Sequence, residues 1–299
     1  MLRRAFIFLF YCFFALLVIG VLLVVLFPRD KFFSWAADRI EQELPGYSIT
    51  IKDIRYVHPL KLRFYQVVFT NDAEKFQIPI DTLLVSFEPK YPLTRVDVSA
   101  VLFGGDLESE VRFDQKNRIA CNNLQLSTMH LTDIELLQRR IERPVQGTLS
   151  FSGKALISRK EAASLRFSGK LQIDNFHTEL RRPIFSNSEI SFASVSASAV
   201  LGDRILDLSE GRASGPLLNG DFMGRVAWER PWQKSRIEIE GGLVPQPKLL
   251  QQHPEAKQVA AQLFQKYRSE SIPYVVDGSM KEPNFRFGKR NESEGNRVN

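Results

Sequence analysis

The feature that most constrains this chain is an uncharged apolar run over residues 5–27, which follows Arg3 and Arg4. At about 1.5 Å of rise per residue, a helix of this length spans roughly 34 Å, enough to cross a hydrocarbon core of about 30 Å. A buried helix of a soluble protein would show a polar stripe, and this run has none. The alternative is a cleavable signal peptide, whose apolar region is normally only about 7–15 residues long. We predict a retained transmembrane helix.

The position of this helix also predicts an orientation. Only residues 1–4 precede it, and long domains translocate largely regardless of their charge. The basic residues on the two sides of the run favour a cytoplasmic N-terminus only modestly. We therefore expect residues 1–4 in the cytoplasm, a single pass through the membrane, and the bulk of the protein on the far side.

Charge and cysteine content narrow the class of protein further. The chain has 40 Lys and Arg against 34 Asp and Glu, and several of the basic residues flank the apolar run. The rest is too balanced for the concentrated basic face that nucleic-acid binding requires. Cys12 lies in the predicted span and Cys121 far beyond it, so we expect no intrachain disulfide. We expect Cys121 to be a buried structural thiol, with a reactive thiol as the alternative.

After the span, the period of the apolar residues changes from helical to strand-like. Residues 31–45 show helical spacing and predict an amphipathic helix next to the membrane, ended by Pro45-Gly46. From residue 46 to 288, short alternating runs separated by turn residues predict one β-rich domain built as an antiparallel meander. Residues 289–299 are polar, and we expect them to be disordered. The apolar face of the amphipathic helix contains Phe32, Phe33, Ala36, Ile40 and Leu44.

Two further helices interrupt the strands. Residues 132–142 begin with Thr132 and Glu135, which fit the S/T-x-x-E pattern of a capping box. Residues 247–270 carry an apolar stripe at helical spacing, and Pro254 lies near the start of its second part. The overall prediction is a mainly β protein: a single N-terminal transmembrane helix, then an extended, curved antiparallel sheet with a few short α-helices.

Such a sheet must cover its apolar face with another layer or with a ligand. The sequence leaves two possibilities open, a closed sandwich core and an open groove whose apolar lining accepts acyl chains. The same residues belong to the face in both cases. They are Leu165, Phe167, Leu171, Ile173, Phe222, Val226 and Trp228.

The sequence contains no recognisable catalytic or metal-binding pattern. No Gly-rich phosphate loop, G-x-S-x-G elbow or H-E-x-x-H motif occurs, and the four histidines are isolated from one another. We therefore predict no metal ion, no cofactor and no enzymatic activity. A site assembled from residues far apart in the sequence is the alternative.

Near the end of the chain, Gly241-Gly242 and Pro245 precede the predicted helix at 247–270, and Gly278, Pro283, Phe285 and Arg286 follow it. Together with the N-terminal apolar run and the β meander, this arrangement resembles the type II secretion system protein N family. In that family a strand leads to Gly-Gly-x-x-x-Pro before a helix, and the last strand reads Gly-x-x-x-x-Pro-x-apolar-Arg. The end of this chain is also similar to the broader AsmA-like group of membrane-anchored β proteins. The matching residues are Gly241, Gly242, Pro245, Gly278, Pro283, Phe285 and Arg286.

The resemblance implies a location and a role. It implies a bacterial inner-membrane protein with a periplasmic domain, which would be a non-enzymatic component of a type II protein secretion system. The AsmA-like likeness implies the alternative of a lipid-binding or lipid-transfer protein with an apolar β-groove. The expected partners are the membrane, other secretion or envelope proteins and phospholipid, without nucleic acid.

Overall fold

A computed structural model of the chain describes residues 47–290, apart from 59, 72–75, 92–93, 115–117, 142, 159–163, 186 and 230–233. The predicted transmembrane helix at 5–27 and the predicted amphipathic helix at 31–45 lie outside the described residues. The predicted disordered tail, 289–299, also lies outside them except for Lys289 and Arg290. Among the described helices, none combines the length and the apolar character needed to cross a membrane.

The chain divides into two compact units, Met1–Leu84 and Val85–Asn299. The range 46–288, predicted as one domain, contains parts of both. In the first unit, β1 (Tyr47–Val57) pairs antiparallel with β2 (Lys61–Asn71), and β3 (Phe76–Phe87) runs across the boundary. Ile54 of β1 and Val67 of β2 are fully buried.

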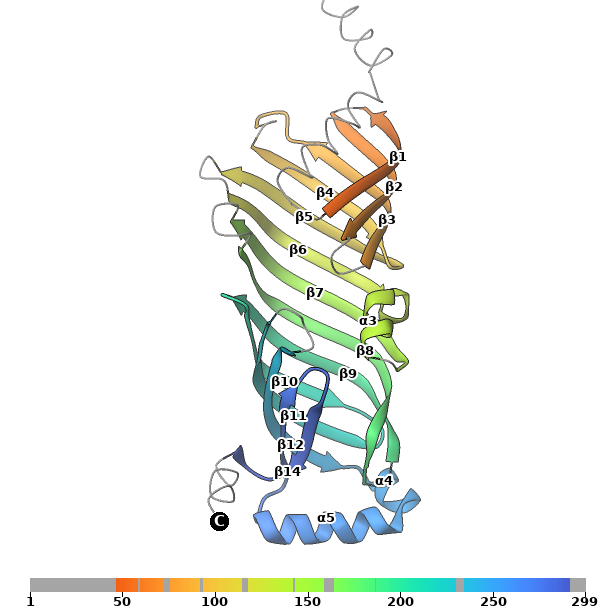
Figure 1. Cartoon of the computed structure of the whole chain (residues 1–299), viewed down its shortest axis with the longest axis vertical. Helices are drawn as coiled ribbons and strands as arrows, with labels where there is room; N and C mark the ends of the chain where they lie inside the picture. Colours follow the sequence, from red (N-terminus) through yellow and green to blue (C-terminus); the bar gives the residue numbers. More distant parts are fainter. Residues whose placement is uncertain are drawn as a thin grey trace, which may run out of the picture. The chain divides into compact units, whose positions relative to one another are not determined.

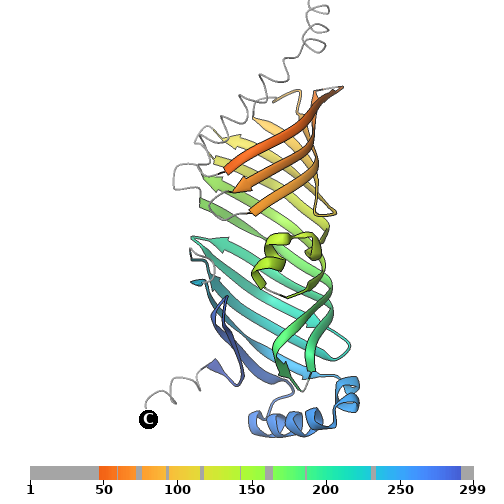
Figure 2. The ribbon, with the colours of Figure 1, turned by 45° about the vertical axis from the view of Figure 1, so that its right-hand side comes forward.

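The second unit is built around a curved antiparallel sheet (Figures 1 and 2). Each strand pairs with the next one along the chain, because the connections between them are mostly short turns. The first and last strands of this unit do not pair with each other, so the sheet stays unclosed. The prediction of a mainly β protein with a curved antiparallel sheet and few helices is confirmed. The strands are β4 (Arg95–Leu102), β5 (Gly105–Asp114), β6 (Arg118–His130), β7 (Val145–Ser158), β8 (Ser164–Ile184), β9 (Asn187–Gly202), β10 (Ile205–Ser214), β11 (Leu218–Ala227), β12 (Arg236–Pro245), β13 (Ile272–Ser279) and β14 (Pro283–Phe287).

In the described part of this unit, helices lie at the β6–β7 and β12–β13 connections. A 3-10 turn, η1 (Leu131–Asp133), and α3 (Glu135–Ile141) lie between β6 and β7. Between β12 and β13 the chain forms α4 (Pro247–Gln252) and α5 (Pro254–Tyr267), which are separated at His253 because Pro254 starts a new helix. Within the predicted stripe of α5, Ala256 and Ala260 are buried, whereas Val259 is 42% exposed.

The capping box predicted at Thr132 is wrong. Thr132 lies inside η1, where its hydroxyl donates a hydrogen bond to Oδ1 of Asp133 (3.2 Å), and α3 begins only at Glu135. The helix is tied to the sheet by Gln138 instead. Its Nε2 donates to the carbonyl oxygen of Val145 (2.8 Å), and its Oε1 accepts from the Val145 N–H (3.2 Å).

Candidate functional site

The candidate site is one face of the sheet in the second unit, and strand pairing defines it. Residues directly opposite each other on neighbouring antiparallel strands point to the same face. From Phe167 in β8, such pairs lead through β9 and β10 to Val226 in β11, and then to Ile237 in β12. In the other direction they lead through Ala155 and Cys121 to Val111 and Val96. The intermediate residues are Leu201 and Leu206.

The last two strands continue the same face. Ile239 of β12 lies opposite Val276 of β13, which lies opposite Phe285 of β14. An apolar face therefore extends from β4 to β14. We call it the apolar face below.

The opposite face of the sheet is polar. There the pairs run from Asp207 to Arg225, then to Glu238 and Asp277. Opposite charges alternate along part of this row, as on a surface that faces water. The two faces thus differ in kind, which is the pattern of an antiparallel sheet with one wet face.

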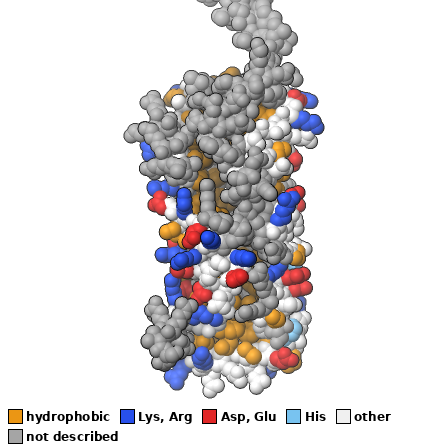
Figure 3. Space-filling view, in the orientation of Figure 1, with side chains coloured by type: hydrophobic (Ala, Val, Ile, Leu, Met, Phe, Trp, Pro, Cys, Tyr) orange, Lys and Arg blue, Asp and Glu red, His pale blue; other side chains and the backbone are white. Residues whose placement is uncertain are grey.

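The structure places six of the seven residues predicted for this face on it by strand pairing. Phe167, Leu171, Ile173 and Phe222 are partly buried, and Val226 is buried. Leu165, at the start of β8, is 45% exposed. Trp228 lies just past the end of β11 and is 48% exposed. In Figure 3, hydrophobic side chains gather in the upper and lower centre of the visible surface, flanked by charged side chains.

Glycines and aromatic rings shape the middle of the apolar face. The rings of Phe151 and Phe167 meet edge to face at a centroid distance of 5.7 Å. Gly153 and Gly169 lie directly opposite each other, and a Cβ on Gly169 would lie 2.8 Å from Cζ of Phe151. The missing side chains therefore let the Phe151 ring lie close against the sheet.

One end of the apolar face is covered by helices. Leu249 of α4 and Ala256 and Ala260 of α5 form a buried cluster with Leu218 and Ile272 from the sheet. Figure 1 shows α4 and α5 at the end of this unit, next to β12 and β14. The described strands form no second sheet over the apolar face.

Cys121 lies on the apolar face, between Val111 and Ala155. Its thiol is not in a disulfide. Burial raises the pKa of the Cys121 thiol, and a hydrogen bond with Ser109 opposes this effect. At neutral pH the side chain is thus a protonated, weakly polar part of the lining.

The residues that carry the resemblance described above, here called the family-like residues, lie in the last strands of the sheet. Gly241 lies between Phe222 and Tyr274, and Gly278, which has a φ of 105°, lies opposite Pro283. The rings of Tyr274 and Phe285 stack at 5.7 Å. Burial, and secondly the charge of a nearby carboxylate, raises the pKa of Tyr274 to about 12. Gly242 and Pro245 belong to the same strand, β12.

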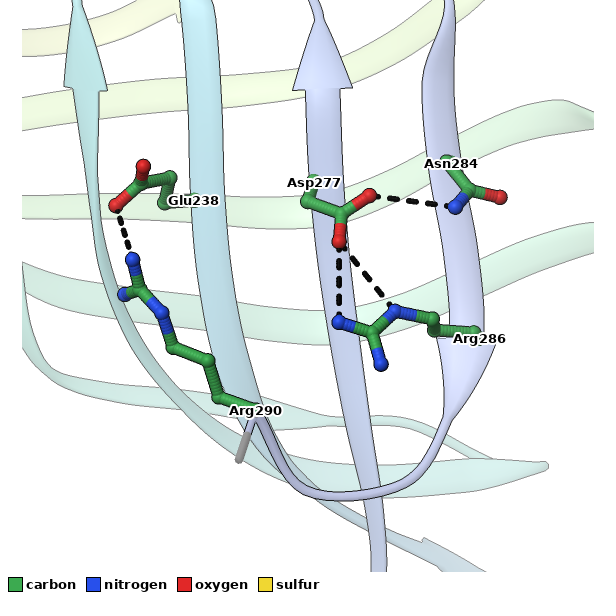
Figure 4. Close-up of polar contacts among 5 residues, drawn as sticks. All are labelled: Glu238, Asp277, Asn284, Arg286 and Arg290. Atoms are coloured by element: carbon green, nitrogen blue, oxygen red, sulfur yellow. Dashed lines mark hydrogen bonds and ion pairs between the residues drawn. The ribbon is translucent and has the colours of Figure 1, made fainter. Parts of the chain in front are cut away.

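Arg286, the last family-like residue, belongs to a charged cluster on the polar face (Figure 4). Glu238 and Asp277 lie directly opposite each other, an arrangement that is destabilising for like charges. Each carboxylate has an arginine beside it. Arg290 Nη2 lies 2.7 Å from Glu238 Oε2, and Arg286 donates to Asp277 Oδ2 from Nη2 (3.1 Å) and Nε (3.3 Å). Asn284 donates to the other oxygen of Asp277 (3.2 Å).

Neither a metal-binding cluster in the described residues nor a similar known protein identifies a function for this chain. In the part of the chain that the structure describes, no group of three or more His, Cys, Asp or Glu side chains is placed to hold a metal ion. No protein-family model, curated protein or solved structure matches the chain.

Proposed function

We propose that this protein binds the acyl chains of lipids on its apolar face. The observation that supports this proposal is an apolar face that strand pairing traces from β4 to β14, on which Phe167, Leu171 and Ile173 are only partly buried and Leu165 is 45% exposed. Contiguous exposed apolar surface is rare on soluble domains and is typical of binding sites. An extended, featureless apolar surface matches an acyl chain, because both lack polar groups that would need partners.

We propose the setting from the sequence. The apolar run at 5–27 would anchor the protein in a bacterial inner membrane, with its bulk in the periplasm. The family-like residues from Gly241 to Arg286 support a role as a non-enzymatic component of a type II protein secretion system. In this proposal lipid binding is the activity, and the secretion apparatus is the context in which it operates.

The test compares two adjacent positions of β8 that face opposite sides of the sheet. Leu171→Arg puts a charge on the apolar face, whereas Gln172→Arg puts the same charge on the polar face. Full-length variants are purified in the same detergent, and retained lipid is extracted and quantified by mass spectrometry. Because both variants keep residues 5–27, lipid held around a membrane anchor is the same in both. We expect Leu171→Arg to retain less lipid than Gln172→Arg. Equal lipid content in two folded variants would refute the proposal.

A second measurement does not depend on a charged substitution. In a Cys12→Ser background, Cys121 remains as the only cysteine, and it lies on the apolar face. An apolar maleimide should label Cys121 more slowly when phospholipid is added to delipidated protein. A labelling rate that is independent of lipid would contradict binding on this face.

A further inference from the structure

A second surface lies at one end of the strands, where β8 begins and where β9 connects to β10 and β11 to β12. We define the hairpin rim as Leu165, Arg204, Trp228 and Lys234. Contacts between the strand ends make it continuous. Arg166, next to Leu165, forms an ion pair of 3.0 Å with Asp203 in the β9–β10 turn. The Trp228 N–H donates to the carbonyl oxygen of Arg204 at 2.7 Å.

The far part of the rim is fixed by Ser235, which is almost completely buried. Its hydroxyl oxygen accepts a hydrogen bond from the Glu229 N–H (3.0 Å), and its carbonyl oxygen accepts one from the Met280 N–H (2.9 Å). These bonds hold Trp228 and Lys234 next to the strand ends. Trp228 is therefore exposed even though hydrogen bonds fix the backbone on both sides of it.

The rim combines exposed apolar side chains with positive charges that form no ion pair with a described carboxylate. Leu165 and Trp228 are each exposed by nearly half. Two described acidic residues of these turns have partners of their own: Asp203 pairs with Arg166, and Glu229 lies 3.8 Å from Arg236. Arg204 and Lys234 form no ion pair with any described residue.

The backbone at Arg204 also points to a role for its side chain. Asp203 and Arg204 form the two-residue turn between β9 and β10 with φ values of 49° and 65°. Turns of this kind favour Gly at the second position, because a side chain there meets steric strain. The chain nevertheless carries Arg at this position, and the side chain is exposed.

We propose that the hairpin rim docks on the surface of an anionic phospholipid bilayer. Trp228 and Leu165 would enter the boundary between headgroups and acyl chains, where tryptophan is favoured, and Arg204 and Lys234 would contact lipid phosphates. Attraction to an anionic surface gives roughly fivefold in affinity for each basic residue close to it. This inference goes beyond the proposed function, because docking of the rim requires no ligand on the apolar face.

The experiment uses the full-length protein in nanodiscs of phosphatidylcholine, so that any membrane anchor is already occupied. The nanodiscs are mixed with vesicles of phosphatidylcholine alone or with phosphatidylglycerol at three to one, and association is measured by flotation. We expect association with the anionic vesicles only, weakened by added salt. Arg204→Gly combined with Lys234→Gln should reduce it by more than tenfold, and Trp228→Ser should also reduce it.

Arg204→Gly suits the left-handed turn, so this variant does not strain the fold. The matched controls are Lys257→Gln on α5 and Met223→Ser on the polar face, both exposed and outside the rim. They should leave association unchanged. Equal association of all variants, or equal association with neutral vesicles, would overturn the proposal. Lipid retained by the Arg204→Gly, Lys234→Gln variant should equal that of the unsubstituted protein, which separates this test from that of the apolar face.

Discussion

Replacing Gly169 by alanine should destabilise the second unit, although alanine is the smallest side chain with a Cβ. The new Cβ would overlap the carbonyl oxygen of Ser152, and it would lie 2.7 Å from Cα of Gly153 and 2.8 Å from Cζ of Phe151. Two of these three atoms belong to the backbone of the neighbouring strand, so the strain cannot be relieved by a side-chain rotation alone. The β7 and β8 strands would have to separate locally.

The magnitude follows from two opposing effects. Overpacking of a tight site costs about 1–3 kcal/mol, whereas the loss of backbone freedom in the unfolded chain favours alanine by about 0.4–1 kcal/mol. Gly202 offers a matched control, because nothing lies within 4 Å of the Cβ that would be added there. Gly202→Ala should therefore keep only the favourable effect. We expect the two variants to differ by about 2 kcal/mol, or about 4–8 °C in melting temperature for a unit of this size.

The assay is thermal unfolding of the full-length variants in one detergent, followed by circular dichroism at a fixed scan rate. In a Phe151→Ala background the ring is absent but the backbone contacts of the new Cβ remain. There, Gly169→Ala should still lower the melting temperature by most of the amount seen with Phe151 present. If Gly169→Ala unfolds at the same temperature as Gly202→Ala, the close approach of β7 and β8 does not control stability.

Three further predictions concern individual side chains. Arg286→Met should lower the free energy of unfolding by about 1 kcal/mol, because its ion pair with Asp277 is partly exposed. In an Asp277→Asn background the partner charge is absent, so the same substitution should cost less than about 0.5 kcal/mol. Urea titrations of the unsubstituted protein, the two single variants and the double variant test this, and additive losses would contradict it. Between pH 10 and 12 the folded protein keeps the Tyr274 proton, whereas an unfolded tyrosine, with a reference pKa of 10.0, releases it. The free energy of unfolding should therefore fall as pH rises, and it should fall less in Tyr274→Phe. Parallel curves for the two proteins would contradict a raised pKa of Tyr274. Alkylation of Cys121 by iodoacetamide, measured in Cys12→Ser, should show a midpoint above the pKa of a free cysteine, because burial raises its pKa; a midpoint at or below that of a free cysteine would show that the thiol is not desolvated.

The apolar face could be largely predicted from the sequence because the sheet is a meander. Phe167 and Val226 are far apart in the chain, yet pairing of consecutive strands places them in one row. Alternation with a period of two determines which residues of each strand share a face. Once neighbouring strands in the sequence are also neighbours in the sheet, the faces follow with little extra information.

The sequence could not predict where the rows shift. Register shifts occur in β6, β8 and β10, and each contains a residue with positive φ. Asn123 and Asn175 are of a type that adopts this conformation readily, whereas Thr128 and Glu210 are not. Such bulges turn one residue out of the alternation, so the pairing across them becomes known only from the structure.

The sequence also could not predict whether the apolar face is covered by a second layer. The same alternation would describe a sandwich core, because it records which side chains share a face and not what covers that face. The structure adds that the described strands of the second unit form one curved, unclosed sheet. The helix at Thr132 illustrates a related limit, since the capping pattern is present but a 3-10 turn uses its residues differently.

The strand order has a consequence for how such a protein can change in evolution. Because every strand of the second unit pairs only with its neighbours in sequence, a hairpin can be added or removed without rerouting the rest of the chain. Each hairpin adds two strand spacings, or roughly 10 Å, to the sheet. Duplication of a short gene segment would therefore lengthen this sheet in regular steps. The helices α4 and α5 could still pack on the strands at one end of it.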